Sequence, residues 1–99
     1  MNERQDHYDL LRKIKDRPSS TQRELASEMG FSLGKLNYCL KSLKKKGHIK
    51  LKNFRNNKNK INYAYILTPR GLAIKTKLTV NFMKRKMKEY NELAKELKK

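Results

Sequence analysis

Hydroxyl, amide and ammonium groups recur on one side of a predicted helix that follows Ser32. On a helical wheel of about 100° per residue, the leucines of 33–46 fall on one side and Tyr38 points away from them. No carboxylate lies on this outward side, and its groups can donate hydrogen bonds to base edges and phosphate oxygens. The pattern predicts a helix that reads a nucleic acid. The candidate contacts on it are Ser32, Gly34, Lys35, Asn37, Tyr38, Lys41, Ser42 and Lys45.

Position along this helix indicates what each side chain does. Lys35 and Asn37 lie near its N-terminus, where base edges are usually met. They offer donors to guanine or a paired amide to adenine. Tyr38 can stack on a sugar or touch a thymine methyl group. Lys41 and Lys45 fit the phosphate backbone better than the bases.

Two helix caps accompany this face. Ser32 is a natural N-cap, and the amides that it caps can hold a phosphate. Thr21 and Glu24 have the spacing of a capping box at the start of the preceding helix, which Gly30 ends. We include Thr21 among the candidate DNA contacts.

A second basic cluster, which we call the wing, covers residues 50–60. It begins within the predicted strand 49–52 and ends where the predicted strand 61–67 starts. It holds five cations, four asparagines and no acid. A solvated hairpin tip would explain these residues, but cations beside a recognition helix favour DNA contact. Arg55 is the candidate for minor-groove insertion, because a narrow groove concentrates negative potential. The candidate contacts in the wing are Lys52, Asn53, Arg55, Asn57, Lys58 and Lys60.

The net charge of +17 is concentrated in one stretch of the chain. No Asp or Glu lies between Met29 and Lys88, whereas 17 of the 26 basic residues do; outside it, 9 basic residues face 9 acidic ones. Such a distribution is typical of a surface that binds a polyanion. A membrane surface is the competing polyanion, but the most basic stretch lacks the pattern of an amphipathic helix.

The residue types that commonly form catalytic or metal sites in proteins are too few and too widely spaced here to form one. His7 and His48 are far apart in sequence, and with Cys39 as the one cysteine no metal site has plausible spacing. Cys39 fits a small core residue. Nearby lysines that would lower its pKa leave a redox sensor as the alternative. We expect no enzyme activity, no metal and no cofactor.

Cysteine usage and hydropathy bear on location. A single cysteine fits a reducing compartment. No apolar run approaches the roughly 20 residues of a membrane-spanning helix, and 1–6 has no apolar signal region. We expect a soluble cytoplasmic protein that does not associate with a membrane.

Apolar spacing predicts the elements that position these residues. A helix over 2–17 carries one apolar stripe and stops at Pro18. The helix over 33–46 buries a stripe of leucines and ends at Gly47. A hairpin follows, and Thr68 and Pro69 begin a helix that continues to Lys99. The predicted buried stripes are Tyr8, Leu10, Leu11 and Ile14, and then Leu33, Leu36, Leu40 and Leu43.

The spacing of Ala26, Gly30 and Leu36 matches the crossing of a helix-turn-helix unit, with an ordinary helical hairpin as the alternative. The order helix, helix, helix, hairpin, long helix predicts a winged helix-turn-helix fold. Its class is mainly α with a small β-hairpin (α+β). We expect a DNA-binding domain over 1–70 and a C-terminal helix over 71–99.

The C-terminal helix carries apolar residues at coiled-coil spacing. About 30 residues of helix span about 45 Å, more than a domain of this size could cover. We therefore expect a homodimer, although the helix could instead fold back over its own domain or bind a different protein. The predicted dimer contacts are Val80, Met83, Met87, Tyr90, Ala94 and Leu97.

Several runs carry a family likeness, which covers nearly the whole chain. The chain resembles the small EPS-associated regulators of the MarR (multiple-antibiotic-resistance) family. The most specific part is GKLNYCL at 34–40 followed by YILTPRG at 65–71. The likeness extends over QRELA at 22–26, SLGKLNYCLKSL at 32–43, NFR at 53–55, YAYILTPRG at 63–71 and LTVNFMKRKM at 78–87.

This resemblance implies a bacterial transcription factor linked to exopolysaccharide genes, with a winged-helix fold and a dimeric state. Larger members of that family add N-terminal dimerisation helices and a ligand pocket between domains. This chain lacks the length for both, so we expect no small-molecule effector and assign dimerisation to the C-terminal helix.

Together these features predict a sequence-specific regulator of transcription that binds double-stranded DNA as a dimer. The helix 33–46 would enter the major groove, and the wing would contact the backbone or the minor groove. The alternative is a non-specific basic protein that binds nucleic acid in an architectural role or associates with RNA.

Overall fold

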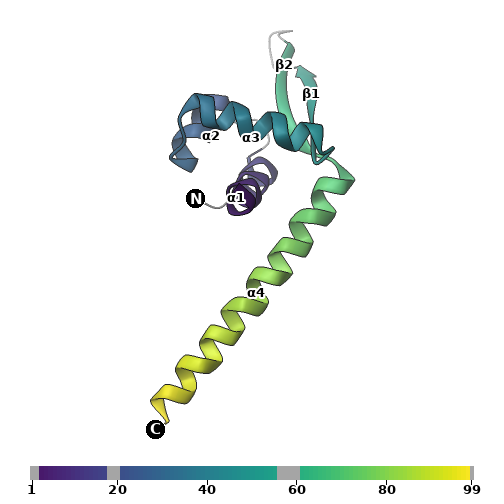
Figure 1. Cartoon of the computed structure of the whole chain (residues 1–99). Helices are drawn as coiled ribbons and strands as arrows, with labels where there is room; N and C mark the ends of the chain where they lie inside the picture. The colour runs from purple at the N-terminus through teal and green to yellow at the C-terminus, as the bar shows by residue number, and fades with distance from the viewer. Residues whose placement is uncertain (1–2, 18–20, 56–60, 99) are drawn as a thin grey trace.

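The computed structural model describes residues 3–17, 21–55 and 61–98. Three helices are followed by a hairpin and a long helix, as Figure 1 shows. The predicted order and the mainly α class with a small hairpin are confirmed. The elements are α1 (Glu3–Asp16), α2 (Gln22–Met29), α3 (Leu33–Lys45), β1 (Ile49–Arg55), β2 (Ile61–Leu67) and α4 (Pro69–Leu97).

Local hydrogen bonds set the ends of the helices where the sequence predicted them. The Glu24 N–H donates to Thr21 Oγ1 at 3.1 Å, and the Glu24 carboxylate accepts from the Thr21 N–H at 3.5 Å, which completes the capping box. Gly30 and Gly47 adopt positive φ angles of 69° and 76°. After α3, the N–H groups of Gly47 and His48 donate to the carbonyls of Lys44 and Leu43, which is the pattern of a Schellman cap.

The core lies where α1, α2 and α3 meet the root of the hairpin. The predicted stripe of α1 is buried in full, and Ala26 and Leu36 are buried as a helix-turn-helix crossing requires. The aliphatic side chains at this crossing exclude water from one contiguous cluster, which is the main stabilising contribution to a fold of this size. Its members are Leu10, Leu11, Ile14, Leu25, Ala26, Leu36, Cys39, Leu40, Leu43 and Ile49.

The prediction that Leu33 is buried is wrong. Leu36, Leu40 and Leu43 join the core, but the Leu33 side chain is 45% exposed. Leu33 is the first residue of α3 and precedes the turns that the core covers. Helical spacing places it on the apolar side, yet spacing alone does not indicate how far along a helix the neighbouring elements reach.

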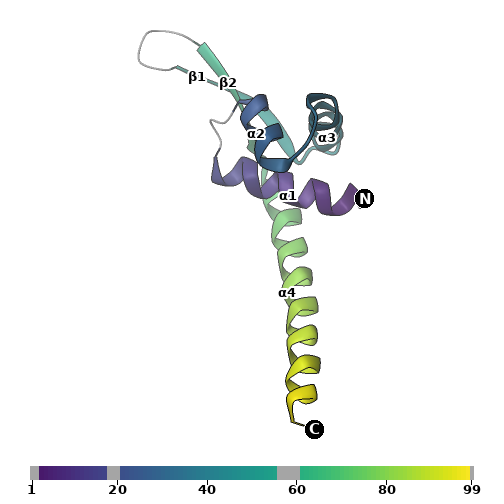
Figure 2. The ribbon, with the colours of Figure 1, turned by 90° about the vertical axis from the view of Figure 1, so that its left-hand side faces the viewer.

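The hairpin pairs β1 and β2 in antiparallel register from Ile49 opposite Leu67 to Arg55 opposite Ile61. Its root belongs to the core, because Ile49 is buried and Tyr65 and Leu67 pack against the cluster. The other end extends away from the three helices (Figure 2). The hairpin is therefore anchored in the core at its root.

The root of the hairpin, the end of α3 and the start of α4 meet at one backbone contact. The Thr68 N–H donates to the His48 carbonyl at 3.1 Å, and the Thr68 hydroxyl donates to the Gly47 carbonyl at 2.5 Å. That hydroxyl also accepts from the Gly71 N–H and so caps α4. A Cβ atom at Gly71 would lie 1.9 Å from the His48 oxygen, so only glycine fits there.

Helix α4 leaves the body of the molecule as a straight rod (Figures 1 and 2). Its first part packs on α1, where the hydroxyls of Tyr8 and Thr79 lie 2.8 Å apart. The rest projects, so that the molecule measures 65 × 27 × 27 Å. The alternative in which this helix folds back over its domain is not what the structure shows. Within the described part of the chain, no helix is both long enough and apolar enough to cross a membrane.

Replacing Gly71 by alanine tests the backbone contact. We expect Gly71→Ala to lower the free energy of unfolding by about 1–3 kcal/mol, because the new methyl group meets a carbonyl that cannot move aside cheaply. Urea denaturation measures the change. The matched control is Gly34→Ala, where a Cβ meets nothing within 4 Å; there alanine should stabilise the helix by about 0.5–1 kcal/mol. Equal effects of both substitutions would contradict the assignment.

Candidate nucleic-acid interface

The outward side of α3 is exposed over most of its length. Tyr38 is 64% exposed, and Gly34, Asn37, Lys41 and Lys45 are exposed around it. The side chains needed to read a base edge or hold a phosphate therefore reach solvent without a rearrangement of the fold. We call the exposed surface of Gly34, Asn37, Tyr38, Lys41 and Lys45 the reading face.

Two of the predicted contacts lie at the edge of this surface and are half-buried, namely Lys35 and Ser42. The Lys35 ammonium lies 3.3 Å from Asp6 Oδ2 on α1 and 4.1 Å from the centroid of the Phe31 ring. In this structure it therefore points toward α1 and the turn before α3. Its predicted contact with guanine requires it to leave these partners.

The caps of α2 and α3 are formed as the sequence predicts. The Lys35 N–H donates to Ser32 Oγ at 3.1 Å. Both Ser32 and Thr21 are exposed, so an anion can approach either helix N-terminus. The Thr21 hydroxyl, however, already donates to the Glu24 carboxylate at 3.1 Å. A phosphate at Thr21 would have to replace that contact, whereas Ser32 has no carboxylate three residues on.

The wing supplies exposed polar groups beside α3. Lys52 and Asn53 are exposed on β1. The backbone of Arg55 ends β1, but its side chain, like Asn57, Lys58 and Lys60, lies outside the described part of the structure.

The sequence analysis missed one exposed aromatic side chain of the hairpin, on the strand that follows the wing. Tyr63, on β2 directly opposite Asn53, is 61% exposed. The sequence analysis placed Tyr63 in the predicted strand 61–67 and gave it no role. Its position two pairs beyond Leu51 and Tyr65, away from the core, is the signal that would have identified it.

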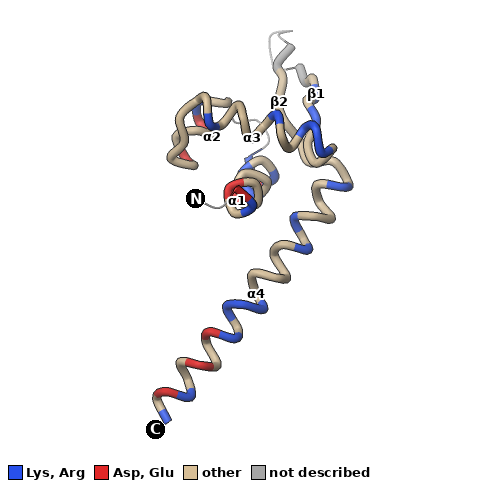
Figure 3. Tube along the Cα trace, viewed as in Figure 1, with Lys and Arg blue, Asp and Glu red and all other residues tan. Residues whose placement is uncertain are grey.

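Charge is divided among the elements of the fold. The acidic side chains lie on α1, α2 and the last turns of α4, as the red segments of Figure 3 show. α3, the strands and the first twenty residues of α4 (69–88) contain none. Glu28 forms ion pairs with Lys13 and Arg17 and so fastens α2 to α1 on the acidic side. Among the described elements, α3, β1, β2 and residues 69–88 of α4 therefore offer a polyanion acid-free segments.

Cys39 is a core residue, as expected. It is 3% exposed, and burial, followed by the charge of Asp6, raises the pKa of its thiol. A raised pKa and burial keep the thiol protonated and inaccessible, whereas a redox sensor needs an accessible thiolate. Among the described residues, no group of three or more His, Cys, Asp and Glu side chains could hold a metal ion.

The two histidines, distant in sequence, line the same hollow of about 510 Å³, formed by α1, the α3–β1 turn and α4. His7 Nδ1 lies 3.5 Å from Lys46 Nζ, and His7 Nε2 lies 3.6 Å from a Glu3 oxygen. Burial, and then the nearby Lys46 charge, lower the pKa of His7 below its ordinary value of 6.5. The pKa of His48 is lowered by burial and then by Lys46 and Arg70.

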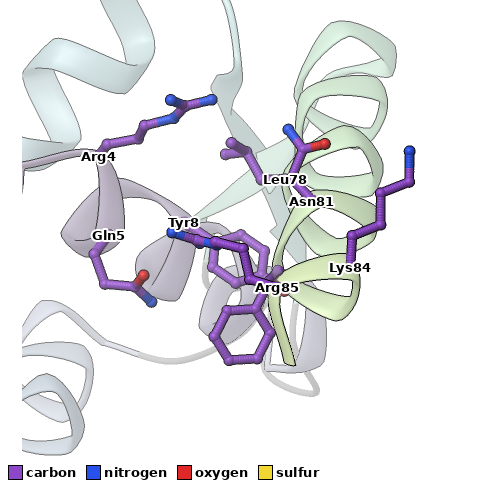
Figure 4. Close-up of a pocket in the computed structure, with 8 residues that line it drawn as sticks. Arg4, Gln5, Tyr8, Leu78, Asn81, Lys84 and Arg85 are labelled. Atoms are coloured by element: carbon purple, nitrogen blue, oxygen red, sulfur yellow. The ribbon is translucent and has the colours of Figure 1, made fainter. Parts of the chain in front are cut away.

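A second hollow, of about 400 Å³, separates α1 from α4 (Figure 4). The rings of Tyr8 and Phe82 form one wall, with centroids 6.4 Å apart. Cations cover both rings: Arg12 lies over Tyr8 at 5.7 Å, and Arg85 over Phe82 at 5.9 Å. The Tyr8–Phe82 contact is one of those through which α4 packs on α1.

The predicted dimer contacts form an exposed apolar stripe on α4. Met83 is 63% and Leu97 is 89% exposed, Val80, Met87 and Tyr90 are also exposed, and Ala94 is half-buried. On a helical wheel the six predicted contacts lie within an arc of about 100°. Leu93 extends the exposed apolar surface on one side of the stripe.

Comparison with known proteins agrees with this architecture. Residues 7–50 match a family described as winged helix-turn-helix DNA-binding. The chain has the winged helix-turn-helix fold. Staphylococcus aureus MarR, solved with salicylate and kanamycin, is similar with a TM-score of 0.72 at 19% identity, over 87% of this chain and 56% of that chain. Among the curated proteins, none matches this chain.

Two further solved structures have the same fold. Streptococcus pneumoniae FabT, solved in complex with DNA, has a TM-score of 0.61 at 22% identity, over 87% of this chain and 58% of that chain. Lactococcus lactis ZitR in an apo form has a TM-score of 0.70 at 19% identity, over 96% of this chain and 69% of that chain. The chain thus spans little more than half the length of MarR and FabT.

The histidine environment predicts how stability depends on pH. A base whose pKa is lowered by folding stays neutral in the native state while the unfolded chain takes up a proton. Stability should therefore be full above about pH 6.5 and decrease as the pH falls below it, toward the folded-state pKa. Urea denaturation between about pH 7.5 and 5.5 measures this slope. The double variant His7→Gln/His48→Gln should lose most of it, and an unchanged slope would refute this origin.

Proposed function

We propose that the protein is a sequence-specific regulator of transcription that binds double-stranded DNA as a dimer, with no enzyme activity. α3 would lie in the major groove, and the wing would contact the backbone or the minor groove. The observation that carries the proposal is the reading face, a capped and acid-free surface with Tyr38 at its centre, beside an equally acid-free wing.

The shape of α3 suits the major groove. Its 13 residues give a rod about 20 Å long, and the groove is about 12 Å wide, enough to admit a helix. Asn37, near its N-terminus, can form two hydrogen bonds with adenine, and Tyr38 can reach a sugar or a thymine methyl group. Leu33, exposed beside Asn37 on the first turn, adds an apolar group that can contact a thymine methyl.

The wing supplies charge more than sequence discrimination. Lys52 and Asn53 lie on β1, the strand that follows α3 in the sequence, and Tyr63 on β2 pairs with Asn53. Contacts of this kind neutralise phosphates and position the protein on the duplex. The proposed wing contacts also include Arg55, Asn57, Lys58 and Lys60, the first of them in the minor groove.

We further propose that the chain is a small bacterial MarR-type regulator of exopolysaccharide-related genes that acts in the cytoplasm at the nucleoid. The fold it shares with MarR, FabT and ZitR supports the first part, and the resemblance of its motifs to the EPS-associated group suggests the target genes. FabT was solved on DNA, which makes DNA the ligand to test first.

Dimerisation through α4 is part of the proposal. An exposed apolar stripe of this length on a projecting helix is costly to leave in water, and pairing with a second copy would bury it. A twofold dimer would present two recognition helices to a palindromic site. The working division is a DNA-binding domain over 1–70 and a dimerisation helix over 71–99, whose first turns also pack on α1.

The competing function is non-specific binding of DNA or RNA through charge. The net charge of +17 supports it, but a charged surface does not need Tyr38 and Asn37 exposed on a capped helix. The two functions differ in how binding responds to changes on the reading face.

Tyr38→Ala and Lys45→Ala distinguish base reading from backbone contact. A duplex is first selected from a random pool by the wild-type protein, and binding is measured by fluorescence anisotropy. Tyr38→Ala should weaken the selected duplex by about 1–3 kcal/mol and leave random duplex nearly unchanged, whereas Lys45→Ala should weaken both alike. Equal losses on both duplexes from Tyr38→Ala, or failure to select any duplex, would favour the non-specific alternative.

Met87→Lys tests the proposed dimer. It places a charge in the stripe and should shift the protein from dimer to monomer in sedimentation velocity at micromolar concentration. The control Glu92→Gln changes net charge equally but lies about 140° around the helix, so it should leave the dimer intact. A wild-type monomer at tens of micromolar would contradict dimerisation without contradicting DNA binding.

A further inference from the structure

One cation at the edge of the reading face is held by the protein itself. Lys35 Nζ lies 3.3 Å from Asp6 Oδ2 and over the Phe31 ring at 4.1 Å. The two charged side chains are 27% and 19% exposed. The pair therefore connects α1, the turn of the helix-turn-helix unit and the first turn of α3.

The position of Lys35 gives its side chain two directions. On a helical wheel it lies about 60° from Tyr38, between the reading face and the flank of α3 that packs on α1. A lysine stem is long and flexible, so its ammonium can reach α1 or the groove from the same backbone position. In the structure it reaches Asp6.

A Lys35 ammonium released from Asp6 could contact phosphate and would strengthen binding to every DNA sequence. An ammonium is a compact charge that attracts any phosphate, and this contribution to affinity is independent of the bases. Specificity is the difference between the affinities for correct and incorrect sites, so a cation that serves both adds nothing to it. Holding Lys35 on α1 leaves the first turns of the reading face to Asn37 and Tyr38.

We propose that Asp6 is a positioning residue, which holds the Lys35 ammonium against α1 and the Phe31 ring and so keeps it off the DNA backbone. This inference rests on the proposed function only in that DNA is the ligand. It gives Asp6, a residue of α1 outside the reading face, a defined effect on binding through Lys35.

The chain offers a matched control for this proposal. Asp9 is also on α1, is half-buried, and accepts a hydrogen bond from Gln5 at 3.0 Å. Asp6→Asn and Asp9→Asn change net charge equally and keep the size of the side chain. A general increase in positive charge therefore affects both variants, whereas release of Lys35 affects only Asp6→Asn.

The experiment measures affinity against salt concentration for a random-sequence duplex and for a duplex selected by the wild-type protein. We expect Asp6→Asn to bind random duplex severalfold more tightly, with the slope of log K against log salt steeper by about 0.9, which corresponds to one more phosphate contact. Both duplexes should gain by about the same factor, so the preference for the selected duplex should stay as in the wild-type protein. Asp9→Asn should keep the wild-type slope and preference.

Lys35→Met supplies an independent measurement that does not depend on how well Asp6→Asn folds. In the wild-type background it should leave the salt slope unchanged, and in the Asp6→Asn background it should restore the wild-type slope. If Lys35→Met alone lowers the slope by about 0.9, Lys35 already contacts phosphate and the proposal is wrong. Identical effects of Asp6→Asn and Asp9→Asn would also overturn it. Failure to select any duplex would contradict the proposed function, but the slopes on random duplex would still test Asp6.

Discussion

The close contact between Gly71 and the His48 carbonyl is the constraint on which the rest of the structure depends. It joins the end of the recognition helix, the root of the hairpin and the start of α4 at one place, with Thr68 bonded to the same turn. The junction is made by backbone groups and by the one hydroxyl group of Thr68. The positions of the wing and of α4 relative to α3 are both set there.

Acidic and basic side chains are separated among the elements that this junction arranges. Acidic side chains are used in the first two helices, where Glu28 pairs with Lys13 and Arg17 to brace the helix-turn-helix unit. The segments that would face DNA carry none. Like charges on α3 and the wing repel one another, and the aliphatic core and the Schellman cap must offset that repulsion in the free protein. Binding a polyanion would remove the repulsion.

The fold was largely predictable because its determinants are local. Thr21, Gly30 and Ser32 act within a few residues of themselves, as Thr68 does in capping α4, and the core stripes follow helical spacing. The pairing of Lys35 with Asp6, the shared hollow of His7 and His48, and the need for glycine at 71 depend on segments brought together only by folding, so spacing could not reveal them. For the same reason the outward side of α3 was identified, but the inward turn of Lys35 was not.

Because α4 is attached rigidly, each residue added to it rotates and shifts everything beyond the insertion by a fixed step. In a dimer built through α4, one inserted residue between the junction and the apolar stripe would turn the stripe by about 100° and advance it by about 1.5 Å. The two recognition helices would then face different directions, although neither reading face had changed. Changes of length in the wing would not alter this phase, because the wing does not lie between the junction and the stripe. The tolerated lengths of these two segments should therefore differ sharply.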